Sequence, residues 1–519
     1  MVKQNNTPLL VIALDAAEPD LVERWINFGL LPNLKLLRLN GSSGRLASTA
    51  DWLAGSPWPT FYTGTTPAEH GLYHSMQWRA DEMRMARPTP SRLPIRPFWL
   101  DLVKDGNLRV VAMDLPMKYP PESFNGLEIN NWATHDQMGP PSSTPSSLLK
   151  WVSQEFGPPP LPDEVWGPQR VKELLTLRNQ LIRATHVVAR VAEALMKREE
   201  WDVFMVGFGA THRGGHKLLD LSSTWGPVGA SDRARFSTAL RDVYVTCDAA
   251  VGQLVKAAGD RVTTIVFSLH GMRPNTSRSY ILPTALNRIL CKIPKYGAQS
   301  RMQGFSQRLS ALREYIPLAW RYATMRKLPM SLQKRLGERQ TRGREYWRTT
   351  PVISLPSDLQ GYIRINLRGR ESEGIVGHGA DFDEICSNIE EGLLTFVDAD
   401  TGRPTVEKVM RRKNLFPQGT HADELPDLIV KWTSSPAANH RAIVSPKYGP
   451  VPWTERGHNP DGRSGNHSPE GFLIATGDNI RPNSQIKNAH ILDLAPTILA
   501  LLDTLKPPYM PGNVLPITK

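Results

Sequence analysis

The fold of this chain is indicated most clearly by its first apolar run, LLVIALD, which extends from Leu9 to Asp15. An unbroken apolar run without polar alternation is typical of a strand that is buried on both faces of a parallel sheet. Open α/β sheets place their ligands at the carboxyl ends of such strands. We therefore predict a central strand at residues 9–14 and a functional carboxylate at Asp15.

Similar apolar segments recur along the chain, each followed by polar residues. Strands are predicted at 109–114, 201–208, 261–268 and 427–430, with a half-buried strand at 361–367. Helical stretches lie between them, notably at 171–198 and 237–258. This alternation predicts an α/β fold with a mostly parallel central sheet that is covered by helices on both faces.

Two segments depart from this alternation. Residues 139–162 are rich in Pro and Ser and predict a surface loop. Residues 287–347 are rich in Arg, Lys, Gln and Leu, with few acids, and predict a basic helical insertion. We therefore expect a first part of the α/β core at 1–286, the basic helical insertion or cap at 287–350, and a second part of the core at 351–519.

The composition limits the partners of the chain. The 519 residues carry a formal net charge of +12, which favours anionic partners; nothing beyond this charge indicates nucleic acid. Neither a secretory signal nor a transmembrane segment is predicted. The three scattered cysteines argue against a cysteine zinc site and fit a reducing, cytoplasmic location. The sequence has no feature that predicts the oligomeric state.

Residues that can bind a metal or act as a nucleophile gather in a few segments. These are Asp15, GSPWPTFYTG (55–64) with PAEHG (67–71), THRGGH (211–216), SLHGM (268–272) and GNHSPEG (465–471). His212 and His216 are four residues apart, so they share one face of a helix and can chelate a metal. Each segment alone has a structural alternative, because an acid after a strand often caps a turn and a lone His is usually structural.

Taken together, these segments resemble the alkaline phosphatase superfamily, most closely its type I phosphodiesterase/nucleotide pyrophosphatase family. TGTTPAEHG (63–71) resembles the segment that follows the family's nucleophile. FSLHGM resembles S-D-H-G-M, THRGGH resembles D-x-x-G-H, and GNHSPEGFLIATG resembles the G-x-H that supplies the last metal ligand. The resemblance runs in the right order from Leu9 to Gly477. It implies an alkaline-phosphatase-like three-layer sandwich.

The resemblance also implies an activity. The family members are hydrolases of phosphate esters, so a small anionic phosphate ester is the expected substrate, with a phosphodiester or pyrophosphate bond. Two metal ions, usually zinc, and a Ser or Thr hydroxyl that forms a phospho-enzyme are implied. By position, Asp15 and His270 match the ligands of one metal, and His216 and His467 match ligands of the other.

Ser56 is the expected nucleophile, with Thr60 as the fallback. Relatives place this hydroxyl about ten residues before the Gly of T-G, and that position is Ala54 here. Ser56 therefore requires a loop that is shorter by two residues, and its alternative role is a helix cap before Pro57. His70 is expected to support this loop.

Two acids of the family pattern are replaced, one by Leu269 and one by His212. Because neutral nitrogen ligands favour zinc over magnesium, we expect one or two zinc ions, with manganese as an alternative. The expected ligands are Asp15, His212, His216, His270 and His467. The lost carboxylates leave a second reading open, in which the chain is a single-metal or non-catalytic relative that acts as a binding protein.

Four further side chains are weaker candidates for contact with the substrate. His135 and Asp136 follow a predicted strand and could reach the cleft. Arg364 and Arg370 lie in a dense polar stretch and could hold a phosphate in a bidentate manner. The alternative for these arginines is an ordinary charged strand end.

Overall fold

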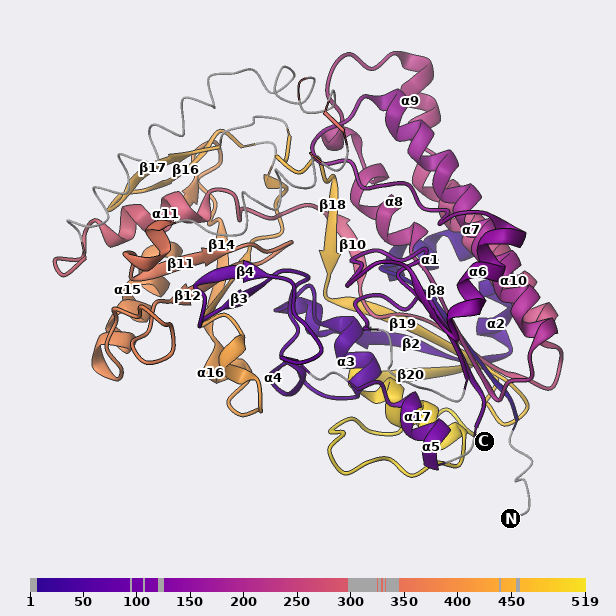
Figure 1. Ribbon diagram of the computed structural model, residues 1–519. Helices are drawn as coiled ribbons and strands as arrows, with labels where there is room; N and C mark the ends of the chain where they lie inside the picture. The colour runs from indigo at the N-terminus through magenta and orange to yellow at the C-terminus, as the bar shows by residue number, and fades with distance from the viewer. Residues whose placement is uncertain are drawn as a thin grey trace.

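The computed structural model describes residues 7–93, 96–105, 108–119, 126–296, 324, 328–329, 332, 345–437, 440–453 and 458–519. These residues form two lobes that lie side by side (Figure 1). The larger lobe is built around a nine-stranded sheet, and the smaller lobe around a four-stranded sheet. The chain passes from the larger lobe into the smaller one and returns near its C-terminus (Figure 1).

The sheet of the larger lobe is mostly parallel. Its strand order is β20 (Ser484–His490), β2 (Gly41–Ala47), β19 (Glu470–Thr476), β9 (Thr263–Ser268), β1 (Leu9–Leu14), β8 (Val203–Phe208), β5 (Val110–Met113), β6 (Gly126–Asn130) and β7 (Ser142–Thr144). The strands from β9 to β6 are all parallel to their neighbours, whereas β19 and β7 run antiparallel. The predicted central strand is therefore confirmed as β1, in the middle of the nine-stranded sheet and flanked by the parallel strands β9 and β8.

Helices cover both faces of this sheet. One face holds α1 (Pro19–Asn27), α2 (Pro32–Leu39), α6 (Ser146–Phe156), α7 (Val171–Arg198), α8 (Ala210–Leu218) and α10 (Ala239–Ala258). The other holds α3 (Pro57–Thr63), α5 (Trp99–Asp105) and α17 (Leu494–Leu501). An apolar core lies on each face of the sheet, and alternate residues of β1 point into the two cores. Leu10 and Ile12 belong to the core under the first set of helices, and Leu9 and Val11 belong to the core under the second set. The three-layer α/β sandwich is thus confirmed, and its two-sided burial explains why β1 is apolar throughout.

Short elements complete the larger lobe. They are α4 (Pro67–His70), α9 (Ala230–Phe236) and the antiparallel pair β10 (Gly271–Pro274) and β18 (Gly465–Ser468). The β3 (Gln77–Arg79)–β4 (Arg84–Ala86) hairpin lies against the smaller lobe (Figure 1). The pair β10–β18 brings the late GNHS segment against the segment that follows β9.

The smaller lobe has its own core. Its antiparallel sheet has the order β11 (Val352–Leu355), β12 (Gly361–Ile365), β15 (Leu428–Trp432) and β14 (Val406–Arg411). The lobe also contains α11 (Leu282–Leu290), α15 (Ala380–Leu394), α16 (Arg412–Leu415) and the strands β13 (Val397–Asp398), β16 (Ala442–Ser445) and β17 (Gly449–Pro452). A further apolar cluster, which includes Leu53, Tyr73, Ile353 and Tyr362, joins the two lobes.

Three sequence-based expectations differ from this arrangement. The segment 139–162, predicted as a surface loop, contains β7 and α6, because Leu148 and Val152 of α6 pack into the core. The strand predicted at 427–430 pairs within the four-stranded sheet and not with the parallel one, because a short apolar run does not specify its partner strand. Most of the region assigned to a second part of the core builds the smaller lobe, and the main sheet is completed only by β19 and β20. Most of the predicted insertion at 287–350 lies outside the described residues; α11 ends within it at Leu290.

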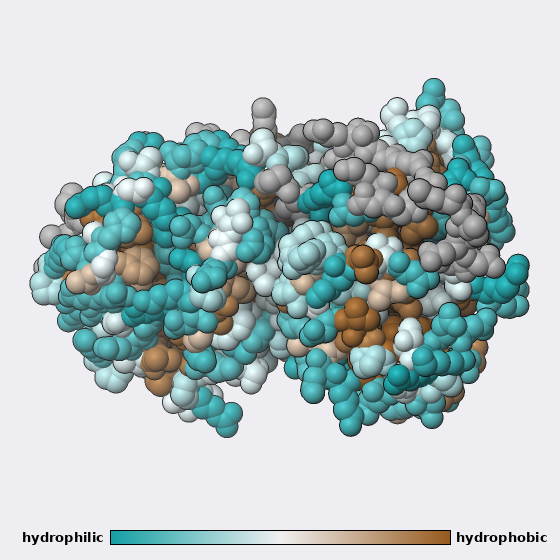
Figure 2. All heavy atoms as spheres, turned by 90° about the horizontal axis from the view of Figure 1, so that it is seen from below, coloured by the Kyte–Doolittle hydropathy of each residue, from teal (hydrophilic) through white to brown (hydrophobic). Residues whose placement is uncertain are grey.

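In the part of the chain that the structure describes, no helix combines the length and the apolar character that a bilayer span requires. The face seen in Figure 2 is mostly hydrophilic, with hydrophobic side chains gathered mainly on the half that belongs to the larger lobe. Large exposed apolar side chains of this lobe include Leu505, Tyr509 and Val514, near the C-terminus.

Candidate metal centre

Six side chains from separate segments meet at the carboxyl ends of the parallel strands. Asp15 directly follows β1, His270 follows β9, and His212 and His216 lie on α8, which follows β8. The remaining two are His135, after β6, and His467, on β18. All six are at least nine-tenths buried. The predicted ligand set of Asp15 and four histidines is therefore brought together, and His135 joins it.

The backbone at this edge of the sheet is strained. Ala16, Asp114, Asn131 and Asp136 have φ values of 53°, 53°, 58° and 51°, in the left-handed region that residues with a Cβ rarely adopt. Such conformations cost of order 1 kcal/mol or more each and cluster at functional sites. Their position next to the histidines agrees with a site at this edge.

Hydrogen bonds orient three of the imidazole rings. His216 Nδ1 lies 2.9 Å from the Gly465 carbonyl, and His467 Nδ1 lies 3.2 Å from the Ala54 carbonyl. Since a carbonyl only accepts, both Nδ1 atoms carry the proton, and each Nε2 has a free lone pair. His212 Nδ1 lies 2.8 Å from Asp15 Oδ2 in the same manner. All three Nε2 atoms converge, since His212 Nε2 is 2.9 Å from that of His216 and 3.2 Å from that of His467.

This arrangement fits a metal ion. Without a cation, the Nε2 lone pairs of His212, His216 and His467 would face one another. A proton on His212 Nε2 could form a hydrogen bond with only one of the other two Nε2 atoms. His270 is buried with neither ring nitrogen hydrogen-bonded, which is costly for a polar group unless a ligand is bound there. Potential ligand atoms of His135, His212 and His216 lie within 4.8 Å of one another, as do those of His212, His270 and His467. The residues therefore suit one or two cations, with His212 common to both groups.

The electrostatics keep His270 and Asp15 in metal-binding states, whereas, despite burial, the charge of Asp15 and its hydrogen bond raise the pKa of His212. Burial lowers the pKa of His270 to about 4, so its ring is neutral at pH 7. Burial alone would raise the pKa of Asp15, but the charge of His212 and the hydrogen bonds from His212 and Trp58 hold it below its ordinary value. Neutral imidazoles and an ionised carboxylate are the forms that coordinate a metal.

Further acids surround the centre, and the sequence analysis did not predict two of them. Asp136, which was expected to reach the cleft, has its Oδ1 3.3 Å from His135 Nε2. Glu164, which was not expected there, has its Oε2 3.8 Å from His135 Nδ1. On the other side, the backbone carbonyl of Asp358, in the β11–β12 turn, accepts a 2.6 Å hydrogen bond from the amide of Asn466, the neighbour of His467. No motif or spacing marks Glu164 and Asp358, because each reaches the centre from a loop remote in sequence.

The two candidate nucleophiles are engaged elsewhere. The Ser56 hydroxyl, fully buried, donates to the Leu53 carbonyl at 2.7 Å and lies 2.7 Å from Thr49 Oγ1. Thr60 Oγ1 lies 3.0 Å from His70 Nε2, which gives His70 the supporting contact that was expected of it. The backbone of Ala54, by contrast, touches the centre through His467. The position where relatives place the hydroxyl thus carries a methyl group.

Arg364 and Arg370 form hydrogen bonds within the smaller lobe. Arg364 is fully buried; it donates to Glu371 and to the carbonyls of Asp423 and Leu425. Arg370 forms a bidentate pair with Asp427, with both hydrogen bonds at 2.7 Å. Their donors are committed to these partners, so we do not include either arginine in the proposed site. Leu269 belongs to the apolar core around Phe267 and Trp58.

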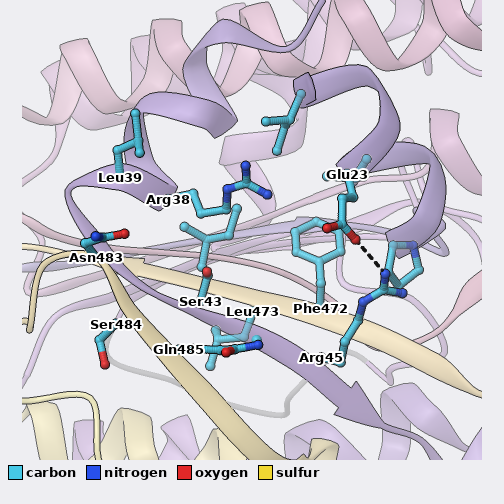
Figure 3. Close-up of a pocket in the computed structure, with 15 residues that line it drawn as sticks. Glu23, Arg38, Leu39, Ser43, Arg45, Phe472, Leu473, Asn483, Ser484 and Gln485 are labelled. Carbon is cyan, nitrogen blue, oxygen red and sulfur yellow. Dashed lines mark hydrogen bonds and ion pairs between the residues drawn. The ribbon is translucent and has the colours of Figure 1, made fainter. Parts of the chain in front are cut away.

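A groove of about 410 Å³ lies apart from the centre, between α1 and α2 and the strands β2, β19 and β20 (Figure 3). None of the six clustered residues lines it. Arg45 on its rim pairs with Glu23 at 3.0 Å and with Asp20 at 2.7 Å. The candidate centre is therefore defined by its side chains and not by the shape of this groove.

Comparisons with known proteins identify the family. Residues 9–434 match the model of the type I phosphodiesterase / nucleotide pyrophosphatase family, so the chain belongs to this family of hydrolases, within the alkaline phosphatase superfamily. A comparison with curated protein sequences finds no match.

Solved structures share the fold at low sequence identity. Phosphonoacetate hydrolase from Sinorhizobium meliloti 1021, in complex with phosphonoformate, is 12% identical over 96% of each chain, with a TM-score of 0.50. An inactive form of murine ectonucleotide pyrophosphatase / phosphodiesterase 5, in complex with AMP, is 13% identical over 97% of this chain and 96% of that one, with a TM-score of 0.47. At these identities the likeness concerns the fold alone.

Proposed function

We propose that the chain hydrolyses small phosphate esters, with phosphodiester or pyrophosphate bonds as its substrates, in a reaction that depends on one or two bound zinc ions, or on manganese. The observation that supports this proposal is the convergence of the Nε2 atoms of His212, His216 and His467 beside His270, whose ring nitrogens are unpartnered. Membership of the family supports the reaction class.

The chain's own residues have distinct tasks in this proposal. Asp15, His212, His216, His270 and His467 would hold the metal, with His135 as a further candidate ligand. When bound, the metal supplies a Lewis acid that polarises a phosphoryl oxygen and neutralises developing charge. The carbonyls of Gly465 and Ala54 fix the tautomers of His216 and His467, and Asp15 fixes that of His212. The burial of the cluster excludes most water.

The hydrogen bonds of Ser56 bear on the identity of the nucleophile. A phospho-enzyme on Ser56 would require its hydroxyl to leave the Leu53 carbonyl and Thr49. The position of Ala54 favours attack by a water molecule instead. We expect Ser56→Ala to keep the bound metal and to retain more than about a tenth of the activity. A loss of more than about 100-fold with unchanged zinc content would assign the nucleophile to Ser56.

The test of the function has two parts. Protein purified without chelators is measured for zinc and manganese by elemental mass spectrometry, and is assayed with bis(4-nitrophenyl) phosphate and with nucleotide pyrophosphates. His467→Ala should lower both the metal content and the turnover, whereas the control His186→Ala, at an exposed position of α7, should change neither. Metal-replete protein that hydrolyses none of these esters would contradict the proposal.

A second candidate function is supported by specific residues. Leu269 and Ala54 replace a carboxylate and a hydroxyl, and Ser56 is hydrogen-bonded away from the cluster. A metal-binding protein that binds phosphate esters without hydrolysing them is therefore the alternative. It would bind inorganic phosphate in a metal-dependent manner and show no turnover.

We also propose a cytoplasmic location, which the unpaired thiols of Cys247, Cys291 and Cys386 support and which cell fractionation would test.

A further inference from the structure

Arg463 is a buried guanidinium with unused hydrogen-bond donors. Its side chain is nine-tenths buried, and its Nη1 donates to Asp358 Oδ1 at 2.7 Å. Its other contacts are looser, since Nη2 lies 3.7 Å from Glu164 Oε1 and Nε lies 3.9 Å from Asp461 Oδ2. A guanidinium has five N–H donors, and only the contact with Asp358 is within hydrogen-bond distance among the described residues. Most donors of Arg463 are therefore available to a ligand.

The partners of Arg463 place it at the edge of the histidine cluster. Asp358 adjoins the His467 side through the amide of Asn466, and Glu164 adjoins the His135 side at 3.8 Å. Because the guanidinium of Arg463 contacts both Asp358 and Glu164, it lies between the His467 side and the His135 side of the cluster.

The loop that carries Arg463 is held rigidly. Lys217, buried on α8, donates to the carbonyls of Asp461 at 2.8 Å and Gly462 at 3.2 Å. The backbone N–H of Arg463 donates to Asp461 Oδ1 at 2.9 Å, and the amide of Asn459 donates to the Arg463 carbonyl at 2.9 Å. A preorganised donor loses little conformational entropy when an anion binds.

Two acids at this edge of the cluster are partly exposed to solvent. The side chains of Glu164 and Asp136 are 32% and 28% exposed, whereas that of His135 between them is only 6% exposed. A ligand that approaches the histidines from this edge would meet the free donors of Arg463.

We propose that Arg463 binds a negatively charged, unesterified oxygen of the phosphoryl group that the histidine centre takes as substrate. This inference rests on the proposed function, and it extends it to a specificity-determining residue. Paired N–H donors of a guanidinium match two phosphoryl oxygens in a bidentate manner, whereas a lysine offers one point charge. Ligands with more than one anionic oxygen should therefore bind more tightly than neutral triesters.

The test uses the full chain loaded with zinc, titrated with inorganic phosphate by calorimetry. We expect Arg463→Gln to weaken phosphate binding by roughly 10- to 100-fold, as expected for the loss of charge-assisted hydrogen bonds. Arg463→Lys should restore part of the affinity. With bis(4-nitrophenyl) phosphate, Arg463→Gln should raise KM more than it lowers kcat, at unchanged zinc content.

Asp358→Asn is the matched control, because it breaks the same ion pair from the other side. It should keep or tighten phosphate binding, since it removes a carboxylate that competes for Arg463. Equal weakening by Asp358→Asn and Arg463→Gln would overturn the proposal and leave Arg463 a purely structural role, as would unchanged affinity in both Arg463 variants. Phosphate binding that depends on Arg463 in a protein without turnover would instead refute only the hydrolysis.

Discussion

His70 shows how burial determines a protonation state at a single residue. Its Nδ1 accepts the backbone N–H of Leu72 at 3.0 Å, so its Nε2 carries the proton that faces Thr60 at 3.0 Å. Burial, followed by the charge of His421, lowers the pKa of His70 to about 3, from 6.5. The unfolded chain therefore takes up a proton below pH 6.5 that the folded chain accepts only near pH 3.

This difference predicts a pH effect on stability. Because the unfolded state binds more protons between pH 6.5 and 3, the contribution of His70 falls as the pH falls, by about 1.4 kcal/mol per pH unit. The stability gap between the wild type and His70→Gln should therefore narrow between pH 7 and pH 5, measured by urea unfolding with chelator present. The control is His186→Gln, at an exposed site; curves for His70→Gln that stay parallel to the wild type would refute the prediction.

The surroundings of Leu269 determine the effect of a substitution at this position. Its side chain is 1% exposed and belongs to the apolar core with Phe267. Leu269→Asp would restore the family's carboxylate in sequence but would bury it without a partner, at a cost of several kcal/mol. We expect a lower free energy of unfolding and no gain in zinc, measured by chemical unfolding and elemental analysis. Increased zinc at unchanged stability would show that position 269 faces the metal.

At the scale of elements, loops between the strands and helices complete the centre. The β11–β12 turn of the smaller lobe reaches the larger one, where the amide of Gln360 donates to the Ala50 carbonyl at 2.6 Å. The hydroxyl of Tyr362 accepts the backbone N–H of Ala54 at 3.0 Å, which fixes the carbonyl that orients His467. The two lobes therefore cooperate in placing one metal ligand.

The loop before β18 supplies a prediction at this scale. Gly462 has a φ of 66°, and a Cβ there would lie 2.1 Å from the backbone of Gly167. Gly402 has a φ of 68°, and a Cβ there would have no heavy atom within 4 Å. Gly402→Ala therefore costs only the backbone strain. Gly462→Ala should lower the free energy of unfolding by more than Gly402→Ala, by about 1–3 kcal/mol, and should weaken phosphate binding as well. Equal effects of the two variants would mean that the loop can move away from Gly167.

At the scale of the whole molecule, a metal ion would link segments that lie far apart in the chain. Asp15, His212, His270 and His467 come from four segments of the larger lobe that meet only after folding. A ligand that binds only the folded state stabilises it by about 2.7 kcal/mol at 100 times its Kd.

We therefore expect chelation to lower the Tm of the wild type by several degrees, measured by scanning calorimetry, and added zinc to restore it. His467→Ala should start from a lower Tm and respond much less to the chelator. An identical Tm with and without chelator, in protein that contains zinc by elemental analysis, would contradict a structural link through these residues.

Several features followed from the sequence alone. The apolar run Leu9–Leu14 predicted a strand buried on both faces, because six consecutive apolar residues have no polar side to expose. The helices at 171–198 and 237–258 were recognised from their length and pattern, and α7 and α10 occupy these positions. The motifs and their order indicated the family. Their positions after strands predicted that Asp15 and the four histidines lie close together, because side chains at the ends of parallel strands meet at one edge of the sheet.

Only the tertiary structure decided how these residues are used. It hydrogen-bonded the Ser56 hydroxyl to Leu53 and Thr49 and placed the Ala54 carbonyl against His467, and such contacts are not encoded in a motif. It assigned the strand at 427–430 to a separate antiparallel sheet, since an apolar run does not encode its neighbour. It also gathered Glu164, Asp358 and Arg463 around the centre. These residues lie in loops without periodicity, so their convergence depends on long-range packing that no local pattern records.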